Sequence, residues 1–223
     1  RFFGDQVSHN VVKYLMEAGA KVSIQSDQSG EHLRDFREYG AFLVRHGLRR
    51  DHALQALTIN GARAMMLSDR IGSIEEGKDA DLVLLDGDPF DLTADRVERV
   101  IVDGIVEYER DKVLQSDRLT RVGPFGPIQG EEHLTHSNFA ITNAQIFTVS
   151  EGIIRRGTLV INDGKFSRVD EELYVPDGVP VIDVGGRVVM PGWVTARAFP
   201  NDWIGDIKWQ VQNDELVDMI APH

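Results

Sequence analysis

Asp27 is the residue of this sequence whose position best suits chemistry. It ends the segment Lys21–Asp27, in which apolar and polar residues alternate as in a short strand. A helical pattern at Val11–Met16 and a glycine at position 19 precede this segment, so the chain forms one helix–glycine–strand repeat of an α/β fold. Such folds place their chemistry at the carboxyl ends of strands. We therefore expect Asp27 to face a site; the alternative is a surface acid next to a turn at Ser29-Gly30.

A metal site in this chain would use histidine and carboxylate ligands, because the sequence contains no cysteine. Six of the seven histidines are candidates. His9 and His32 lie near Asp27, His46 and His52 beside predicted helix ends, and His133 and His136 in a polar segment. None of these pairs has the spacing of metal ligands. Solvated loop or helix-end positions are the alternative for each of them.

Composition narrows the class of protein. The chain has 223 residues, of which 42% are hydrophobic and 27% charged, as is usual for soluble globular domains. Its net charge of −12 argues against a nucleic-acid partner. No apolar run approaches the ~20 residues that span a bilayer. The sequence begins at Arg1, without an initiator Met, and ends at His223 without a helix stop signal, so we expect both ends to be cut. The compartment stays unknown.

The first block of the chain, residues 1–113, predicts helices followed by strands. Helical patterns cover residues 36–47, 51–57 and 62–67, and a buried strand is expected at Leu82–Leu85. An Asp-Gly pair at 103–104 between apolar runs predicts a β-hairpin.

The second block is rich in strands. Residues 114–137 have no periodicity and are interpreted as a linker. From residue 138 onwards β-branched and aromatic residues prevail, and hairpin turns are expected at Asn162–Lys165 and at Gly185-Gly186.

Two parts of the sequence resemble the amidohydrolase (metal-dependent hydrolase) superfamily. Residues 59–90 resemble the hinge between its barrel and its small β-sandwich, with a helix end, turns at Gly72 and Gly77, an Ala-Asp-Leu strand and an Asp-Pro stop. The runs ITNAQIF, VINDGKFSRV and VIDVGGRVVMPGWV resemble the amino-terminal sandwich strands of the same superfamily. The pattern is most similar to the imidazolonepropionase-like branch.

This resemblance implies an α/β plus all-β fold, the carboxyl-terminal part of a (β/α)8 barrel joined to a composite β-sandwich. The tail of one unit would run into the head of a second one. We expect the last barrel strand and its helices at 1–68 and the carboxyl-terminal sandwich strands at 69–113. The linker follows at 114–137, then the amino-terminal sandwich strands at 138–192 and the start of a second barrel at 193–223. Since hairpins alone are marginally stable, we expect the two strand sets to pack together; in the competing arrangement each set pairs with strands outside this chain.

The resemblance also implies a metal site. Asp27 would bind a divalent metal, zinc being expected as one or two ions, and accept a proton from water, while most ligands lie outside this chain. In the second unit, Arg197 and Phe199 stand where the family has a His-x-His metal pair. Neither side chain can ligate a metal, so the second unit is expected to be catalytically silent.

The implied activity is metal-assisted hydrolysis of a C–N bond in a small-molecule substrate, such as a cyclic amide. This chain alone is expected to be inactive, because the rest of the barrel would come from polypeptide that is missing here. Whether the protein forms a homo-oligomer stays an open question. The alternative, from a different class, is a non-catalytic structural or assembly module derived from an amidohydrolase.

Overall fold

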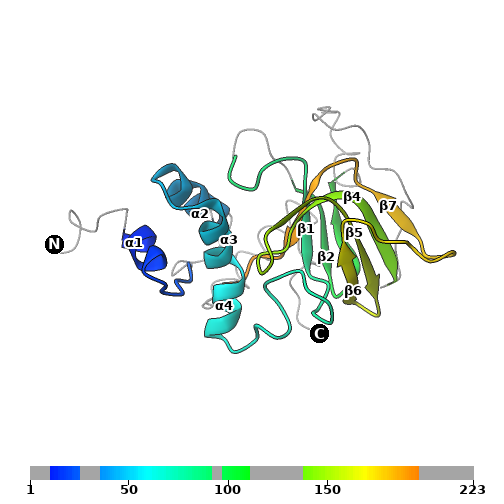
Figure 1. The fold of residues 1–223 in the computed structure, drawn as a ribbon, viewed down its shortest axis with the longest axis horizontal. Helices are drawn as coiled ribbons and strands as arrows, with labels where there is room; N and C mark the ends of the chain where they lie inside the picture. The colour runs from blue at the N-terminus through cyan, green and yellow to red at the C-terminus, as the bar shows by residue number, and fades with distance from the viewer. Residues whose placement is uncertain (1–10, 26–35, 92–96, 111–137, 196–223) are drawn as a thin grey trace, which may run out of the picture.

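Helices and sheet occupy opposite ends of the molecule. The computed structural model describes residues 11–25, 36–91, 97–110 and 138–195 (Figure 1). The helices are α1 (Val11–Glu17), α2 (Phe36–Arg45), α3 (Arg50–Leu57) and α4 (Ile59–Ala64). Three of the predicted helices are confirmed, whereas the fourth, expected at 62–67, lies three residues earlier as α4. Gly19 and Gly47 follow α1 and α2 with positive φ, as helix ends favour. No helix in these ranges is long and apolar enough to cross a membrane.

The strands form one mixed sheet. They are β1 (Leu82–Leu85), β2 (Val97–Val102), β3 (Ile105–Glu109), β4 (Phe139–Phe147), β5 (Ile153–Asn162), β6 (Lys165–Asp170), β7 (Val181–Asp183) and β8 (Val188–Pro191). Their order is β3-β2-β1-β8-β4-β5-β6, and β7 also pairs with β4. The hairpins predicted at residues 103–104 and 162–165 are confirmed, because β2 pairs with β3 and β5 with β6 in antiparallel register.

Strands from the two blocks of the chain pair directly with each other. β1 and β8 are antiparallel, in a register that runs from Leu82 opposite Pro191 to Leu85 opposite Val188. The expected pairing of the two strand sets is thus present within this one chain. Whether the sheet forms a two-layered sandwich of the family type stays a prediction.

A second seam joins the two blocks at residues 78–80, the segment that precedes β1. The Ala80 N–H donates to the Gly164 carbonyl (2.7 Å), and the Phe166 N–H donates to the Lys78 carbonyl (2.9 Å). At this seam the Gly104 turn meets the Gly164 turn so closely that a Cβ on Gly104 would lie 2.8 Å from the Gly164 Cα. Both glycines have positive φ, so both turn geometry and contact require glycine. The sheet is therefore held together along two lines of contact between the blocks.

The hairpin predicted at Gly185-Gly186 is wrong. β7 and β8 flank these glycines, but each pairs in parallel with β4, β7 at residues 140–142 and β8 at residues 145–146. Asn143 lies between these two stretches with a positive φ of 56°, and its carbonyl accepts the Gly186 N–H (2.7 Å). The two glycines therefore form an offset that carries the chain along β4 rather than back on itself.

Three apolar clusters make up the core. The largest lies within the sheet and includes the fully buried aromatic residues Phe139 and Phe166. A second cluster joins the sheet to the helices through Leu54, Val83 and Val194. The third lies among α1, α2 and α3. The helical end is therefore tied to the sheet mainly through α3, α4 and the chain that leaves β8.

Candidate functional site

The segment that leads to Asp27 is extended and anchored to α3 and α4. The Ile24 N–H donates to the Ala56 carbonyl (2.9 Å), and the Asn60 amide nitrogen donates to the Val22 carbonyl (2.8 Å). Residues 20–25 belong to no strand pair of the described sheet. Asp27 itself lies in 26–35, outside the described residues, so its role stays a prediction.

The chain that leaves β8 meets the same two helices. The Gly192 N–H donates to the Asp81 carbonyl (3.1 Å), and the Val194 N–H donates to the Leu57 carbonyl (2.9 Å). A Cβ on Gly61 would overlap the Val194 carbonyl oxygen, so α4 and this segment are in close backbone contact. Arg197 and Phe199, the expected replacements of a metal-binding histidine pair, lie beyond the described residues.

The described histidines lie on helices. The His46 Nδ1 contacts the Phe42 carbonyl (2.8 Å) just after α2, and the imidazole ring lies 4.1 Å from the Phe42 ring. His52 lies in the first turn of α3, with its Nδ1 buried. The remaining sequence candidates, His9, His32, His133 and His136, lie outside the described residues. Within the described ranges, no three histidine, aspartate or glutamate side chains are arranged to hold a metal ion.

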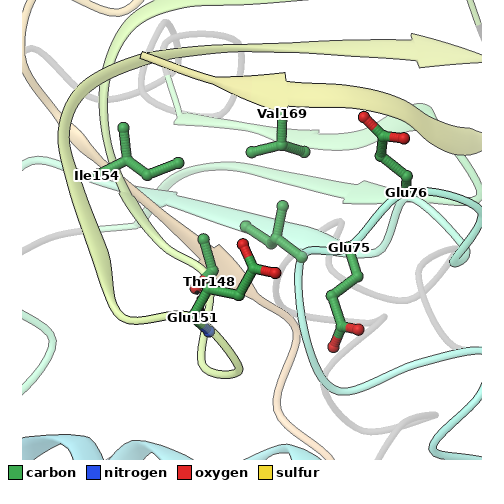
Figure 2. A pocket seen from close by; sticks show the side chains of 7 residues that line it. Glu75, Glu76, Thr148, Glu151, Ile154 and Val169 are labelled. Atoms are coloured by element: carbon green, nitrogen blue, oxygen red, sulfur yellow. Dashed lines mark hydrogen bonds between the residues drawn. The ribbon is translucent and has the colours of Figure 1, made fainter.

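A cavity of about 320 Å³ opens beside the segment that enters β1. Its lining is Ile74, Glu75, Glu76, Thr148, Glu151, Ile154 and Val169. Figure 2 shows that the carboxyl groups of Glu75 and Glu76 point away from each other. The Glu75 carboxylate accepts hydrogen bonds from the Ser73 hydroxyl (2.5 Å) and the buried Lys78 ammonium (2.9 Å). Burial raises the pKa of Glu75, but these hydrogen bonds outweigh burial and lower the pKa. The charged carboxylate therefore binds the loop at Ser73 and Lys78.

The Asp79 carboxylate binds two cationic side chains, one from each block of the chain. Its side chain is 6% exposed and receives Lys165 on Oδ1 (2.5 Å) and Arg70 on Oδ2 (2.6 Å). Burial raises the pKa of Asp79, but the hydrogen bonds from Lys165 and Arg70 outweigh this effect and hold the pKa below its ordinary value. The carboxylate is therefore charged at neutral pH and links the start of β1 to the start of β6.

Asp81, two residues further on, has the opposite electrostatics. Burial raises the pKa of its carboxyl group, and the charges of Asp103 and Asp79 add to this effect. The Asp103 N–H, which donates to the Asp81 Oδ1 (2.9 Å), lowers the pKa only in part. Asp81 therefore supports the Asp103-Gly104 turn at an electrostatic cost.

Sequence reasoning missed the link through Asp79. Lys165 is 86 positions away from Asp79, and no local pattern connects them. The sequence contains the two Asp-Gly turns, at residues 103–104 and 163–164, which have similar φ values and are in contact, but it does not relate them to each other. The structure gives these charged groups a structural role at the seam.

Comparison with known proteins finds relatives of the first block. The profile of the amidohydrolase family matches residues 7–106. An imidazolonepropionase from Thermoplasma volcanium is 30% identical over 112 residues, which cover 47% of this chain and 28% of that protein. An N-substituted formamide deformylase from Arthrobacter pascens is 33% identical over 115 residues, which cover 44% of this chain and 21% of that protein.

Among solved structures, an amidohydrolase from Thermotoga maritima MSB8 matches 46% of this chain and 27% of its own, with 37% identity and a TM-score of 0.44. The family profile and the curated relatives confirm the predicted resemblance to the amidohydrolase family and to its imidazolonepropionase-like branch. The chain spans about a quarter of the length of the curated relatives described above.

Proposed function

We propose that this chain is part of a metal-dependent hydrolase that cleaves C–N bonds in small molecules such as cyclic amides or formamides. The observation that carries the proposal is the family match over residues 7–106, which includes the extended segment that leads to Asp27. The relatives named imidazolonepropionase and N-substituted formamide deformylase support C–N bonds as the chemical class.

In this proposal Asp27 is both a metal ligand and the group that accepts a proton during hydrolysis. A carboxylate suits both tasks, because it offers oxygen ligands to a cation and can act as a general base. The hydrogen bonds of residues 22 and 24 to α4 and α3 hold the described segment that precedes position 27, which supports this proposal. The same proposal assigns residues 1–68 to the end of a barrel and residues 69–113 and 138–192 to a composite sandwich.

The described residues do not themselves fit a metal ion. They contain no cluster of three suitable ligands, and the chain has no cysteine. In this proposal, as the resemblance implies, most of the other ligands for one or two zinc-like ions come from further polypeptide, and the chain by itself is inactive.

A second candidate is a non-catalytic assembly module, and the sheet favours it. The sheet buries a core of its own, and the two blocks meet in it along two seams. A sheet with such a core can serve assembly without any chemistry.

Metal analysis and a single substitution separate the two candidates. In the full-length natural protein, the hydrolase proposal expects about one or two equivalents of a zinc-like metal per unit. Asp27→Asn would abolish the hydrolysis of a panel of cyclic amides and N-substituted formamides. Glu172→Gln, at an exposed acid after β6, serves as the matched control and would leave the rate unchanged. A folded, metal-free protein with no turnover would reject the hydrolase and favour the module.

A further inference from the structure

The sequence contains four Asp-Gly pairs, at residues 86–87, 103–104, 163–164 and 177–178. An Asp-Gly pair can rearrange with no reagent except water. The glycine nitrogen attacks the aspartate Cγ, so that a C–N bond forms, a C–O bond breaks and one molecule of water leaves. Glycine favours this step because it has no Cβ to obstruct the closure of the five-membered ring.

Water then opens the ring at one of its two carbonyl carbons. Attack at Cγ regenerates aspartate, whereas attack at the backbone carbonyl breaks the original peptide bond and leaves an isoaspartyl residue. In this product the main chain runs through Cβ and Cγ and is one atom longer, and the former backbone carbonyl carbon belongs to a free carboxylate. The mass of the chain does not change, and the reaction needs no oxidant or second substrate.

The fold decides which of the four pairs can react. The glycine nitrogen must leave its hydrogen-bond partner and turn towards the side chain of the preceding aspartate. A pair that is held by packing and hydrogen bonds can do this only when the structure around it opens, and the cost of such opening differs widely between parts of one protein. A pair in an exposed turn without packed neighbours can react in the folded state.

The two pairs of the first block are held in place. Asp86, at the end of β1, is 1% exposed, so packing fixes its side chain. In the turn between β2 and β3, the Gly104 nitrogen, which would be the attacking atom, donates its hydrogen to the Ala80 carbonyl (3.2 Å). The Asp103 N–H donates to the Asp81 carboxylate (2.9 Å), which holds the other half of this pair. Both pairs are therefore protected while the sheet is folded.

The pair in the turn between β5 and β6 is held at the seam. The Asp163 N–H donates to the side-chain oxygen of Asn138 (2.6 Å), and the Gly164 carbonyl accepts the Ala80 N–H (2.7 Å). A Cβ on Gly164 would lie 2.5 Å from the Asp103 carbonyl oxygen, so this turn also packs against the turn between β2 and β3. Rotation within this pair therefore requires the two blocks to separate.

The fourth pair, Asp177-Gly178, lies in the connection between β6 and β7, and both of its residues are exposed. A Cβ on Gly178 would meet no heavy atom within 4 Å, whereas the same test gives distances of 2.8 and 2.5 Å at Gly104 and Gly164. The Asp177 carboxylate accepts a hydrogen bond from the Tyr174 hydroxyl (3.2 Å), but Tyr174 is itself 74% exposed. The backbone at this pair can thus rotate without displacing a packed neighbour.

We propose that Asp177 is a site of spontaneous isoaspartate formation in the folded protein, while the fold protects the other three Asp-Gly pairs. The proposal goes beyond the hydrolase assignment and does not depend on it. The new carboxylate is the group that isoaspartyl carboxyl methyltransferases methylate from a sulfonium methyl donor. An enzyme of this class would therefore recognise aged protein and not fresh protein.

The rearrangement would act on β7. The turn before this strand is closed by the Val179 N–H, which donates to the Pro176 carbonyl (3.2 Å), and the Pro180 carbonyl accepts the Ala140 N–H (2.8 Å). An additional main-chain atom at position 177 changes the span of this turn. β7 has three residues, and β4 is its partner in the described sheet, so we expect β7 to be loosened. β8 also pairs with β1 and would stay in place.

Ageing of the full-length natural protein at neutral pH tests the proposal. Peptide mapping separates the aspartyl and isoaspartyl forms of each of the four pairs, and labelled methyl transfer by an isoaspartyl carboxyl methyltransferase counts the product. The same chain unfolded in urea gives the rate of each pair without the fold. We expect folding to slow the reaction at positions 86, 103 and 163 by at least about a hundredfold, and at position 177 by less than about tenfold.

Two matched variants assign the signal to one residue. Asp177→Glu should remove it, because glutamate would have to close a six-membered ring, which forms more slowly. Asp170→Glu, at an exposed acid of β6 that glycine does not follow, should leave it unchanged. Amide exchange of residues 181–183 should be faster in aged than in fresh natural protein, and ageing should not change it in Asp177→Glu.

Protection at position 177 as strong as at the other three pairs would overturn the proposal, as would earlier accumulation of isoaspartate at position 103 or 163. Isoaspartate at position 177 with unchanged exchange in β7 would overturn the effect on that strand. These measurements require neither metal nor turnover. Failure of the hydrolase assay and failure of this proposal are therefore distinguishable results.

Discussion

The sheet and the helical end of this molecule differ in how completely they bury their apolar residues. In the sheet, β1 is buried along its whole length between β2 and β8, one neighbour from each block. At the helical end, α1 and α2 leave large apolar side chains exposed, among them Tyr14, Leu15 and Phe42. Figure 1 shows these helices at the end of the molecule away from the sheet.

This difference concerns the centre of the sheet. There β1, β8 and β4 have strand partners on both edges and enclose the largest core cluster of the described residues. The helical end has extended segments without strand partners in the described sheet and an apolar outer surface, features that suit contact with another layer. The described residues therefore combine a well-packed centre of the sheet with helices whose outer faces are partly apolar and exposed.

Truncation of a leucine in each region gives the largest expected contrast. Leu84 is 1% exposed in β1, so Leu84→Ala should lower the free energy of unfolding of the 223-residue chain by about 2–5 kcal/mol. Leu15→Ala, in the exposed face of α1, should change it by less than about 0.5 kcal/mol. Urea denaturation of both variants measures the contrast. Equal losses would show that the two regions are equally well packed.

Removal of the charge at Asp79 tests the seam with a smaller effect. Asp79→Asn should cost about 1–3 kcal/mol, a range that allows for the exposure of both cationic partners to water. The lowered pKa means that the carboxylate stabilises the fold above its ordinary pKa and loses this contribution as the pH falls through the folded value. Stability of the natural chain should thus drop more steeply in acid than that of Asp79→Asn, as thermal melts at several pH values would reveal. If the stability of the two proteins depended on pH in the same way, Asp79 would not stabilise the seam through its charge.

The same measurement on Asp81 should give a smaller effect of opposite sign. Its raised pKa means that the contribution of Asp81 to stability is fully present below the ordinary pKa and is lost as the pH rises through the folded value. Asp81→Asn keeps an oxygen for the Asp103 N–H and removes the buried charge, so it should stabilise the chain at neutral pH by about 0.5 kcal/mol. A lower melting temperature at neutral pH would contradict this assignment.

Local chemistry made much of this fold predictable. The buried strand Leu82–Leu85 and the turns at 103–104 and 163–164 followed from apolar runs and Asp-Gly pairs, and the structure has them in place. The turn at Gly185-Gly186 was mistaken for a hairpin, because a glycine pair permits an offset as readily as a reversal and only the partner strand decides.

Long-range features lay beyond sequence reasoning. The β1–β8 register and the link from Asp79 to Lys165 depend on residues about a hundred positions apart, which no local pattern relates. The candidate site was proposed from the end of one extended segment and from family resemblance. Position 27 stays a prediction, although the structure fixes the backbone that leads to it through residues 22 and 24.

Cross-linking of β1 to β8 tests most directly that the two blocks form one body. Val83 and Met190 lie opposite each other, and directly opposed residues in antiparallel strands have Cα separations that allow a disulfide. Because the chain has no cysteine, Val83→Cys with Met190→Cys creates a single pair, and Val83→Cys with Ile105→Cys is the control. We expect oxidation to give a disulfide within one chain for the first pair and none for the second. A first pair that stays reduced, or that links only two molecules, would contradict the account.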